Sequence, residues 1–313
     1  MTVPVPIQLI RGRHRRPDTL PRDKKPPWLR VRAPGSPDYL QLKRLMRNLS
    51  LTTVCEEANC PNIGECWSHG TATFMILGDI CTRSCGYCNV VHGTPQAIDA
   101  QEPTRVAKAV RTLGLQHVVI TSVDRDDIDD GGSGIFASTI ETIRKQSPQC
   151  RIEVLIPDFS GRTNDLHTVL NAGPNILNHN IETVERLYRV ARPGGRYKRA
   201  LGLLKTAGDY RPTIPTKSGV MVGLGESLDE LFRTMSDLRE VDCNILTIGQ
   251  YLRPSLAHLP VVKYYHPDEF TMLQERASAL GFRHVESGPL VRSSYHAHEQ
   301  ANAAELSSTS CSA

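Results

Sequence analysis

Three cysteines lie within eight residues of this 313-residue chain, in the stretch CTRSCGYCNV at positions 81–90. Cys81, Cys85 and Cys88 are separated by three and then two residues. A structural zinc site normally fills four positions, with two pairs of Cys or with one pair and two His. Three thiolates leave one position of a metal centre open, and an open position is where chemistry can occur. The spacing therefore predicts a reactive metal centre.

An iron–sulfur cluster suits three thiolates better than a single ion does. Short cysteine-rich loops bind clusters through thiolates, and three Cys on a four-iron cube leave one iron without a protein ligand. Such an iron can chelate a small ligand. Zinc is the alternative metal, and a chance grouping of free thiols is the alternative without a metal.

A second group of three cysteines precedes the first, in VCEEANCPNIGECW at positions 54–67. Cys55, Cys60 and Cys66 are separated by four and then five residues, and three more ligands predict a second cluster. The remaining thiols fit neither group, and we expect them to be inert small side chains or exposed thiols: Cys150, Cys243 and Cys311.

The elements that must position these groups follow from the hydrophobic pattern. Near-continuous apolar stretches, typical of strands buried on both faces, cover positions 71–78, 117–123, 151–157, 175–180, 218–225 and 244–252. Amphipathic patterns between them predict helices at 102–114 and 227–241, the second with Ser227 and Glu230 in capping-box spacing.

This alternation predicts an α/β fold with a parallel sheet and right-handed crossovers. Six units rather than eight indicate a partial, TIM-like (β/α)6 barrel, whose active site lies at the carboxyl ends of the strands. The loop 81–88 directly follows the first strand, so we expect its thiols at that edge. A doubly wound open sheet is the alternative, and periodicity does not separate the two.

The composition is that of an ordinary soluble globular protein. Hydrophobic residues make up 39% and charged residues 22% of the chain, and no run approaches the roughly 20 apolar residues that cross a bilayer. Six of the nine cysteines lie between positions 55 and 88, and no apolar signal segment precedes them. We therefore expect a reducing, cytoplasmic setting, with neither a disulfide framework nor a membrane partner.

Positive charge is concentrated at the N-terminus. Residues 1–38 hold nine Lys or Arg and three Asp, so their net charge is +6. The net charge of the whole chain is +4, so the remaining residues carry a net charge of −2. Eight prolines in this segment predict an extended chain. A solvated tail and a basic arm for an acidic protein partner both remain open. Stacking aromatics are nearly absent, which argues against nucleic acid, and the prolines argue against the amphipathic helix of a transit peptide.

The spacing of the 81–88 loop, with Tyr87 before the last Cys, resembles the signature of the radical S-adenosylmethionine (SAM) superfamily. The resemblance implies that the open iron holds the amino and carboxylate groups of SAM. An electron from the cluster then cleaves SAM to a 5′-deoxyadenosyl radical, because breaking an unactivated C–H bond needs a radical that no side chain supplies. Tyr87 is expected beside the adenine.

Fragments from about residue 25 to residue 297 resemble, in order, those of lipoyl synthases. Besides the segment 54–67 they include KPPWLR (25–30), TSVDRDDIDDGG (121–132), NHNIETV (178–184), TKSGVMVGLGE (216–226) and GPLVRSSYHA (288–297). The resemblance implies insertion of sulfur at C6 and C8 of an octanoyl chain on a lysine of a lipoyl carrier domain. Two [4Fe-4S] clusters and SAM are the implied cofactors.

The second, auxiliary cluster is implied to be the sulfur source, held by Cys55, Cys60 and Cys66. Its remaining iron is implied to bind a serine of the Arg-Ser-Ser-Tyr motif at 292–295, which we assign to Ser294, with Ser293 as the alternative. A hydroxyl is a weaker iron ligand than a thiolate, so it can be released when the cube gives up an atom. A cap or turn residue is the ordinary role of such a serine.

Polar residues at two strand ends are candidates for SAM contacts. They are Thr121, Ser122, Asp124 and Arg125 at the end of the second strand, and Asn180 and Glu182 at the end of the fourth. Asp124 and Arg125 could equally form a structural ion pair, and His179 could be a buried core residue. The glycines at 223–226 permit close backbone approach to a ligand, or form an ordinary turn.

The implied partners are octanoylated lipoyl carrier domains, namely 2-oxoacid dehydrogenase E2 subunits and the glycine cleavage H protein. An electron donor such as ferredoxin or flavodoxin and an iron–sulfur carrier for cluster repair are also implied. The domains expected are a basic extension at 1–50, an auxiliary-cluster segment at 51–70, the partial barrel at 71–285 and a C-terminal tail at 286–313. Two other functions stay open: another radical SAM reaction, such as biotin-type sulfur insertion or methylthiolation, and a non-enzymatic iron–sulfur carrier.

Overall fold

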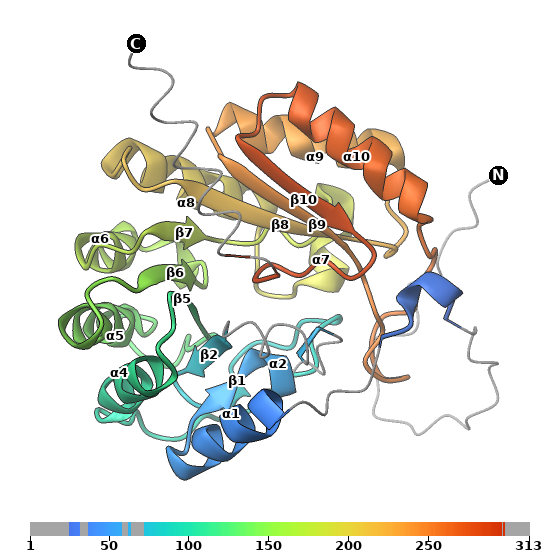
Figure 1. The fold of residues 1–313 in the computed structure, drawn as a ribbon. Coiled ribbons are helices and arrows are strands. Elements are labelled where there is room, and N and C mark those ends of the chain that lie inside the picture. Colours follow the sequence, from blue (N-terminus) through green and yellow to red (C-terminus); the bar gives the residue numbers. More distant parts are fainter. Residues whose placement is uncertain (1–24, 32–36, 58–61, 64–71, 296, 298–313) are drawn as a thin grey trace.

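The structure, a computed structural model, describes residues 25–31, 37–57, 62–63, 72–295 and 297. Its main feature is a curved sheet of eight strands in the order β1-β2-β5-β6-β7-β8-β9-β10 (Figure 1). The strands are β1 (Thr52–Thr53), β2 (Ala72–Ile76), β5 (His117–Ser122), β6 (Arg151–Leu155), β7 (Ile176–Asn178), β8 (Thr216–Val222), β9 (Ile245–Gln250) and β10 (His284–Gly288). All pairs are parallel except β1 with β2.

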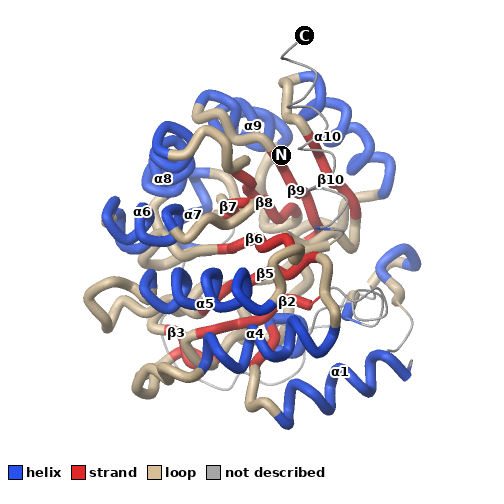
Figure 2. Tube along the Cα trace, turned by 60° about the vertical axis from the view of Figure 1, so that its left-hand side comes forward, coloured by secondary structure: helices blue, strands red, loops and turns tan. Residues whose placement is uncertain are grey.

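The helices cover the outer face of this sheet (Figures 1 and 2). They are α4 (Glu102–Leu113), α5 (Ser133–Gln146), α6 (Thr163–Asn171), α8 (Tyr197–Tyr210), α9 (Leu228–Glu240) and α10 (Pro267–Ala279). Shorter or peripheral elements are α1 (Pro37–Asn48), α2 (Val54–Glu57), α7 (Tyr188–Ala191), and the small sheet of β3 (Ile80–Cys81) with β4 (Val91–His92). Strand order follows chain order and the crossover helices lie on one face, which confirms the partial barrel and excludes the doubly wound sheet.

Local signals in the sequence explain where the predicted helices begin and end. Ser227 and Glu230 form both bonds of the capping box that starts α9. Gly114 adopts a left-handed conformation at the end of α4, with φ of 60°, where a residue without Cβ is favoured. Both predicted helices are therefore confirmed.

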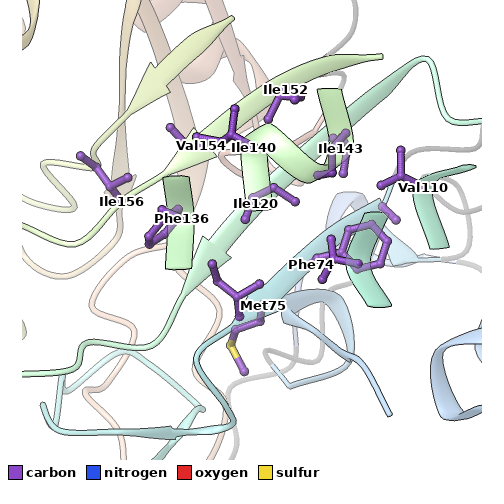
Figure 3. Close-up of a cluster of buried hydrophobic side chains, with 14 of the residues drawn as sticks. Phe74, Met75, Val110, Ile120, Phe136, Ile140, Ile143, Ile152, Val154 and Ile156 are labelled. Atoms are coloured by element: carbon purple, nitrogen blue, oxygen red, sulfur yellow. The ribbon is translucent and has the colours of Figure 1, made fainter. Parts of the chain in front are cut away.

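The core between sheet and helices is apolar, whereas the barrel interior is partly polar. Ile120 and Val154 of the sheet face Phe136 and Ile140 of α5, and all four are almost fully buried (Figure 3). Burying each such side chain contributes about 1.5–3 kcal/mol. On the other face of the sheet, Lys217 Nζ lies 2.8 Å from Glu153 Oε1, which also accepts a bond of 3.1 Å from Asn178 Nδ2.

Two features differ from the sequence-based expectation. The sheet has a further parallel strand, β10, beyond the six predicted. Its sequence HVESG contains three polar residues and lacks a continuous apolar run, which suits a strand at the end of the described sheet. At the N-terminus, a 3-10 turn forms at Pro27–Leu29, and α1 begins at Pro37, where proline is tolerated in the first turn. Residues 1–24 and 32–36 of the expected extended segment lie outside the described residues. No described helix has the length and apolar character needed to span a bilayer.

Candidate metal centre

The loop with Cys81, Cys85 and Cys88 begins just beyond the carboxyl end of β2, as predicted. Cys81 ends β3, and its carbonyl accepts a bond of 2.9 Å from the N–H of Gly93. The N–H of Cys88 donates to the carbonyl of Cys85 at 3.1 Å, which closes a turn. The three thiols are half-buried on one short loop.

Gly86 ties the centre of the loop to two other segments. Its N–H donates to the carbonyl of Ala191 at 2.8 Å, and its carbonyl accepts from the N–H of Leu259 at 2.9 Å. A Cβ on Gly86 would lie 3.0 Å from Cγ of Leu259, so glycine suits this close approach. His258 Nε2 lies 2.9 Å from the carbonyl oxygen of Cys88. The loop is therefore fixed from both sides.

Arg83, between the first two cysteines, binds three carboxylates at the ends of β5 and β6. It donates to both oxygens of Asp126 at 2.6 and 2.7 Å and to Asp158 at 2.7 Å, and lies 3.3 Å from Asp124. Burial alone would lower the pKa of Arg83, but the bond to Asp126 and the charges of Asp124 and Asp158 raise it. Sequence reasoning missed this residue. Its signal was an Arg inside the cysteine motif together with Asp residues after two strands.

The thiols fit an iron–sulfur cluster. The N–H groups of Arg83 and Asp124 point at Cys81 Sγ from 3.4 and 3.3 Å, and such bonds stabilise a cluster thiolate. Burial raises the pKa of Cys85 to about 12 and that of Cys88 to about 11, so deprotonation must be coupled to metal binding. Among the described residues, no group of three His, Cys, Asp or Glu side chains is close enough to hold one metal ion. A four-iron cluster does not require this, because each thiolate binds a different iron.

The candidates at the end of β5 divide into two groups. Thr121 is buried, and its hydroxyl donates to the carbonyl of Leu155 at 2.9 Å. Ser122 Oγ is buried without a hydrogen-bond partner among the described residues. Asp124 Oδ2 lies 3.9 Å from Cys81 Sγ; burial raises the pKa of Asp124, against the opposing charge of Arg83. Asp124 therefore borders the loop, Ser122 Oγ has no described partner, and Thr121 is already engaged.

The ion pair considered between Asp124 and Arg125 is replaced by two others. Arg125 binds both oxygens of Asp127, at 2.8 and 2.9 Å, and the carbonyl of Leu77 at 3.1 Å. Asp124 pairs with Arg83. Arg125 thus fixes the end of β2, and Asp124 belongs to the cysteine loop.

Glu182 lies beside the cysteine loop in a left-handed backbone conformation, with φ of 66°. Its N–H donates to the carbonyl of Gly219 and its carbonyl accepts from the N–H of Met221, at 2.9 and 2.8 Å. Burial raises the pKa of Glu182, which the charge of Arg192 and a hydrogen bond to Tyr87 oppose. Arg192, a buried residue that sequence reasoning missed, places its charge near Tyr87 and Glu182, and its Nη1 donates to the carbonyl of Asn180 at 2.8 Å.

Asn180 contacts the C-terminal motif. Its Nδ2 donates to Ser293 Oγ at 2.8 Å, and that hydroxyl donates to Asn180 Oδ1 at 3.0 Å. Arg292 donates to the carbonyl of Gln250 at 3.0 Å. In Figure 1 the red chain after β10 turns back toward the middle of the molecule. Ser294 is half-buried next to this contact.

The segment with the second cysteine group meets the same tail. Asn62 is buried, and its Nδ2 donates to the carbonyl of Leu290 at 2.6 Å. Cys60 and Cys66 lie outside the described residues, as does the side chain of Cys55, whose backbone is in α2. The assignment of these three cysteines therefore stays a prediction.

Other candidates have structural roles. Burial raises the pKa of Cys150 to about 11 and that of Cys243 to about 12, as expected of inert core thiols. Cys311 lies outside the described residues. His179 is fully buried, with Nδ1 2.8 Å from the carbonyl oxygen of Ile156, and burial lowers its pKa to about 3. The side chain of Glu226 accepts the N–H of Gly223 at 2.6 Å, and Gly223 has φ of 106°, which favours glycine.

Sequence comparisons connect both parts of this site to one family. The model of the radical SAM superfamily matches residues 75–238, and that of the N-terminal domain of lipoyl synthase matches residues 8–60. The chain is 60% identical to a lipoyl synthase of Koribacter versatilis, covering 89% of this chain and 91% of the relative. It is 56% identical to a lipoyl synthase of Rubrobacter xylanophilus, covering 95% and 89%.

Solved structures share the fold at low sequence identity. Methylornithine synthase superposes with a TM-score of 0.51 at 13% identity, covering 79% of this chain and 81% of that chain. The FeFe-hydrogenase maturase of Carboxydothermus hydrogenoformans gives 0.52 at 14%, covering 84% and 78%. At this identity the likeness concerns the fold alone.

Proposed function

This chain belongs to the lipoyl synthase family of radical SAM enzymes, and we propose that it inserts sulfur at C6 and C8 of an octanoyl chain on a carrier-domain lysine. When bound, a cluster on the 81–88 loop would supply the electron that cleaves SAM, and an auxiliary cluster would supply sulfur. The work of the chain itself is to hold these groups and the acyl carbons in one place.

The bond between Asn62 and the Leu290 carbonyl is the observation that carries this proposal. It joins the segment of the second cysteine group to the Arg-Ser-Ser-Tyr tail, 228 positions along the chain. A carrier with one open cluster has no need of this junction. The junction supports an auxiliary site built by Cys55, Cys60, Cys66 and Ser294.

The residues around the cysteine loop suit SAM. Ser122 and Asp124 come from the end of β5, and Tyr87 and Glu182 meet on the other side of the loop. A ribose and an amino group need acceptors, which Asp124 and Glu182 supply, and Tyr87 offers an aromatic surface for adenine. The buried charge of Arg192 is suited to a carboxylate.

The substrates are lipoyl carrier domains, as the family implies. We propose E2 subunits of 2-oxoacid dehydrogenases and the glycine cleavage H protein as the carriers. Ferredoxin or flavodoxin would be the electron donor, a separate carrier would rebuild the auxiliary cluster, and the enzyme would act in the cytoplasm.

Mass spectrometry of a model substrate tests the proposal. The protein, reconstituted anaerobically with iron and sulfide, is incubated with dithionite, SAM and an octanoyl-lysine peptide. Gain of two sulfur atoms by the peptide is the expected result. SAM cleavage with an unchanged peptide would contradict sulfur insertion, and absence of SAM cleavage would contradict the radical reaction itself.

A further inference from the structure

The side-chain amide of Asn180 is fully occupied by neighbouring groups. Nδ2 donates to Ser293 Oγ at 2.8 Å and to Glu182 Oε1 at 3.1 Å, and Oδ1 accepts from Ser293 Oγ at 3.0 Å. Asn180 is 8% exposed. Since an amide nitrogen has two protons to donate, both are used here. The arrangement directs Asn180 toward the C-terminal motif.

Two glycines make room for that motif at the barrel mouth. A Cβ on Gly219 of β8 would lie 2.8 Å from Asn180 Oδ1 and 3.2 Å from Ser293 Oγ. A Cβ on Gly249 of β9 would lie 2.1 Å from the carbonyl oxygen of Val291. The C-terminal segment therefore packs directly against the backbone of β8 and β9 at these two glycines, where any larger residue would block it.

The neighbouring serine differs from Ser293. Residues before the pair are fixed through the Leu290 carbonyl, bound by Asn62, and through Arg292, bound to the Gln250 carbonyl. Within the part of the chain that the structure describes, the Ser294 hydroxyl makes no hydrogen bond. Ser293 is thus engaged, whereas no described residue occupies the Ser294 hydroxyl.

We propose that Asn180 is a positioning residue, which captures Ser293 and thereby presents Ser294 to the auxiliary cluster. The part of this inference that concerns Ser294 rests on the proposed function. Tyr87 of the cysteine loop contacts Glu182, and Glu182 binds Asn180, so one chain of contacts joins the two sites. Asn180 acts on the tail through Ser293 and is not itself a SAM contact.

Trypsin treatment of the full-length apoprotein tests the capture directly. Cleavage after Arg292 releases residues 293–313, which contain no Lys or Arg and form one diagnostic peptide. Asn180→Ala and Ser293→Ala should each speed this release about five- to tenfold, because cleavage follows the opening equilibrium and a lost hydrogen bond changes it by about that factor. The double variant should be no faster than either single one, because both remove the same contact.

Asn178→Ala is the matched control, since Asn178 is a buried amide at the end of β7, two positions before Asn180, and binds Glu153 instead. It should leave the release rate within about twofold of wild type, apart from any loss of global stability. Ser293→Ala leaves the barrel side chains intact, so this variant alone can test the contact if Asn180→Ala fails to fold. Unchanged release in both Asn180→Ala and Ser293→Ala would overturn the proposal.

Reconstituted protein supplies a second readout. Both variants should keep SAM binding and SAM cleavage within about twofold of wild type and lose lipoyl formation about tenfold. Weaker SAM binding in Asn180→Ala alone would overturn the proposal in favour of a SAM contact. Lack of lipoyl formation by the wild type, with the tryptic pattern intact, would overturn the proposed function and leave the capture of Ser293 standing.

Discussion

Arg83 Nη2 lies 2.7 Å from Asp158 Oδ1, so a guanidinium inside the cysteine loop is bound at the end of a strand 75 positions away. Arg83 also pairs with Asp126, and both Arg83 and Asp158 are almost fully buried. Asp158 also binds Arg199 Nη1 at 3.1 Å, so Arg83 is one of two cations on this carboxylate, and breaking a buried ion pair from one side lowers the stability of the fold. The loop and the sheet edge therefore depend on each other before any cluster binds.

Arg83→Gln should lower the free energy of unfolding of the apoprotein by about 3 kcal/mol, because it breaks a buried ion pair, although Asp158 keeps its bond to Arg199. It should also reduce iron bound by the 81–88 loop. The stability and iron content of Arg83→Lys should lie between those of wild type and Arg83→Gln, since lysine keeps the charge but cannot bind a carboxylate through two N–H groups. Urea denaturation and iron analysis measure these effects.

Arg144→Gln is the control for Arg83. Arg144 donates to the Gly173 carbonyl and to Asn175 Oδ1, at 2.9 and 3.0 Å, near the amino ends of the strands. It should cost about 1–3 kcal/mol and leave the iron content unchanged. Equal loss of iron in both variants would show that Arg83 acts only through global stability.

His179 should make the stability of the apoprotein depend on pH. Its folded pKa of about 3 lies below the ordinary value of 6.5 because burial disfavours the cation. The unfolded chain binds the proton more readily, so stability is complete above pH 6.5 and falls as the pH drops toward 3. Between pH 6.5 and 5 the loss should be about 2 kcal/mol.

His179→Gln keeps a donor for the Ile156 carbonyl and cannot titrate. In urea denaturation from pH 5 to 7.5, the free energy of unfolding should change less with pH for this variant than for wild type. Comparing the two proteins cancels the contribution of the other histidines. Parallel curves for the two proteins would show that His179 does not control acid sensitivity.

The two cysteine groups should be separable by function. Cys85→Ala should abolish SAM cleavage and lipoyl formation, whereas Cys60→Ala should retain SAM cleavage and abolish lipoyl formation. Wild type should bind about eight irons per chain and each variant about four, on the basis of one four-iron cube per cysteine group. Cys150→Ala, in the core, should keep both reactions and the full iron content. Lipoyl formation by Cys60→Ala would refute the two-cluster assignment.

Sequence patterns predict local elements here, and tertiary contacts explain what they miss. The apolar runs predict β2 and β5 to β9 because burial on the helix-facing side needs Ile and Val. The partners of Arg83 and Asn62 lie 41–75 and 228 positions away, a distance over which spacing carries no information. The Lys217–Glu153 ion pair could not be predicted from the sequence either, because only the folded barrel brings side chains of β6 and β8 together in its interior.

The seat of the C-terminal tail can be tested from the barrel side with Gly249→Ala. The added Cβ would lie 2.1 Å from the carbonyl oxygen of Val291. Because this oxygen belongs to the backbone, the clash can be relieved only if the tail itself moves away. Tryptic release of residues 293–313 should rise about tenfold and lipoyl formation should fall, with SAM cleavage retained. Gly202→Ala is the control: nothing lies within 4 Å of the added Cβ, and helix α8 should gain about 0.5–1 kcal/mol. Wild-type lipoyl formation by Gly249→Ala would mean that the tail does not seat on β9 during catalysis.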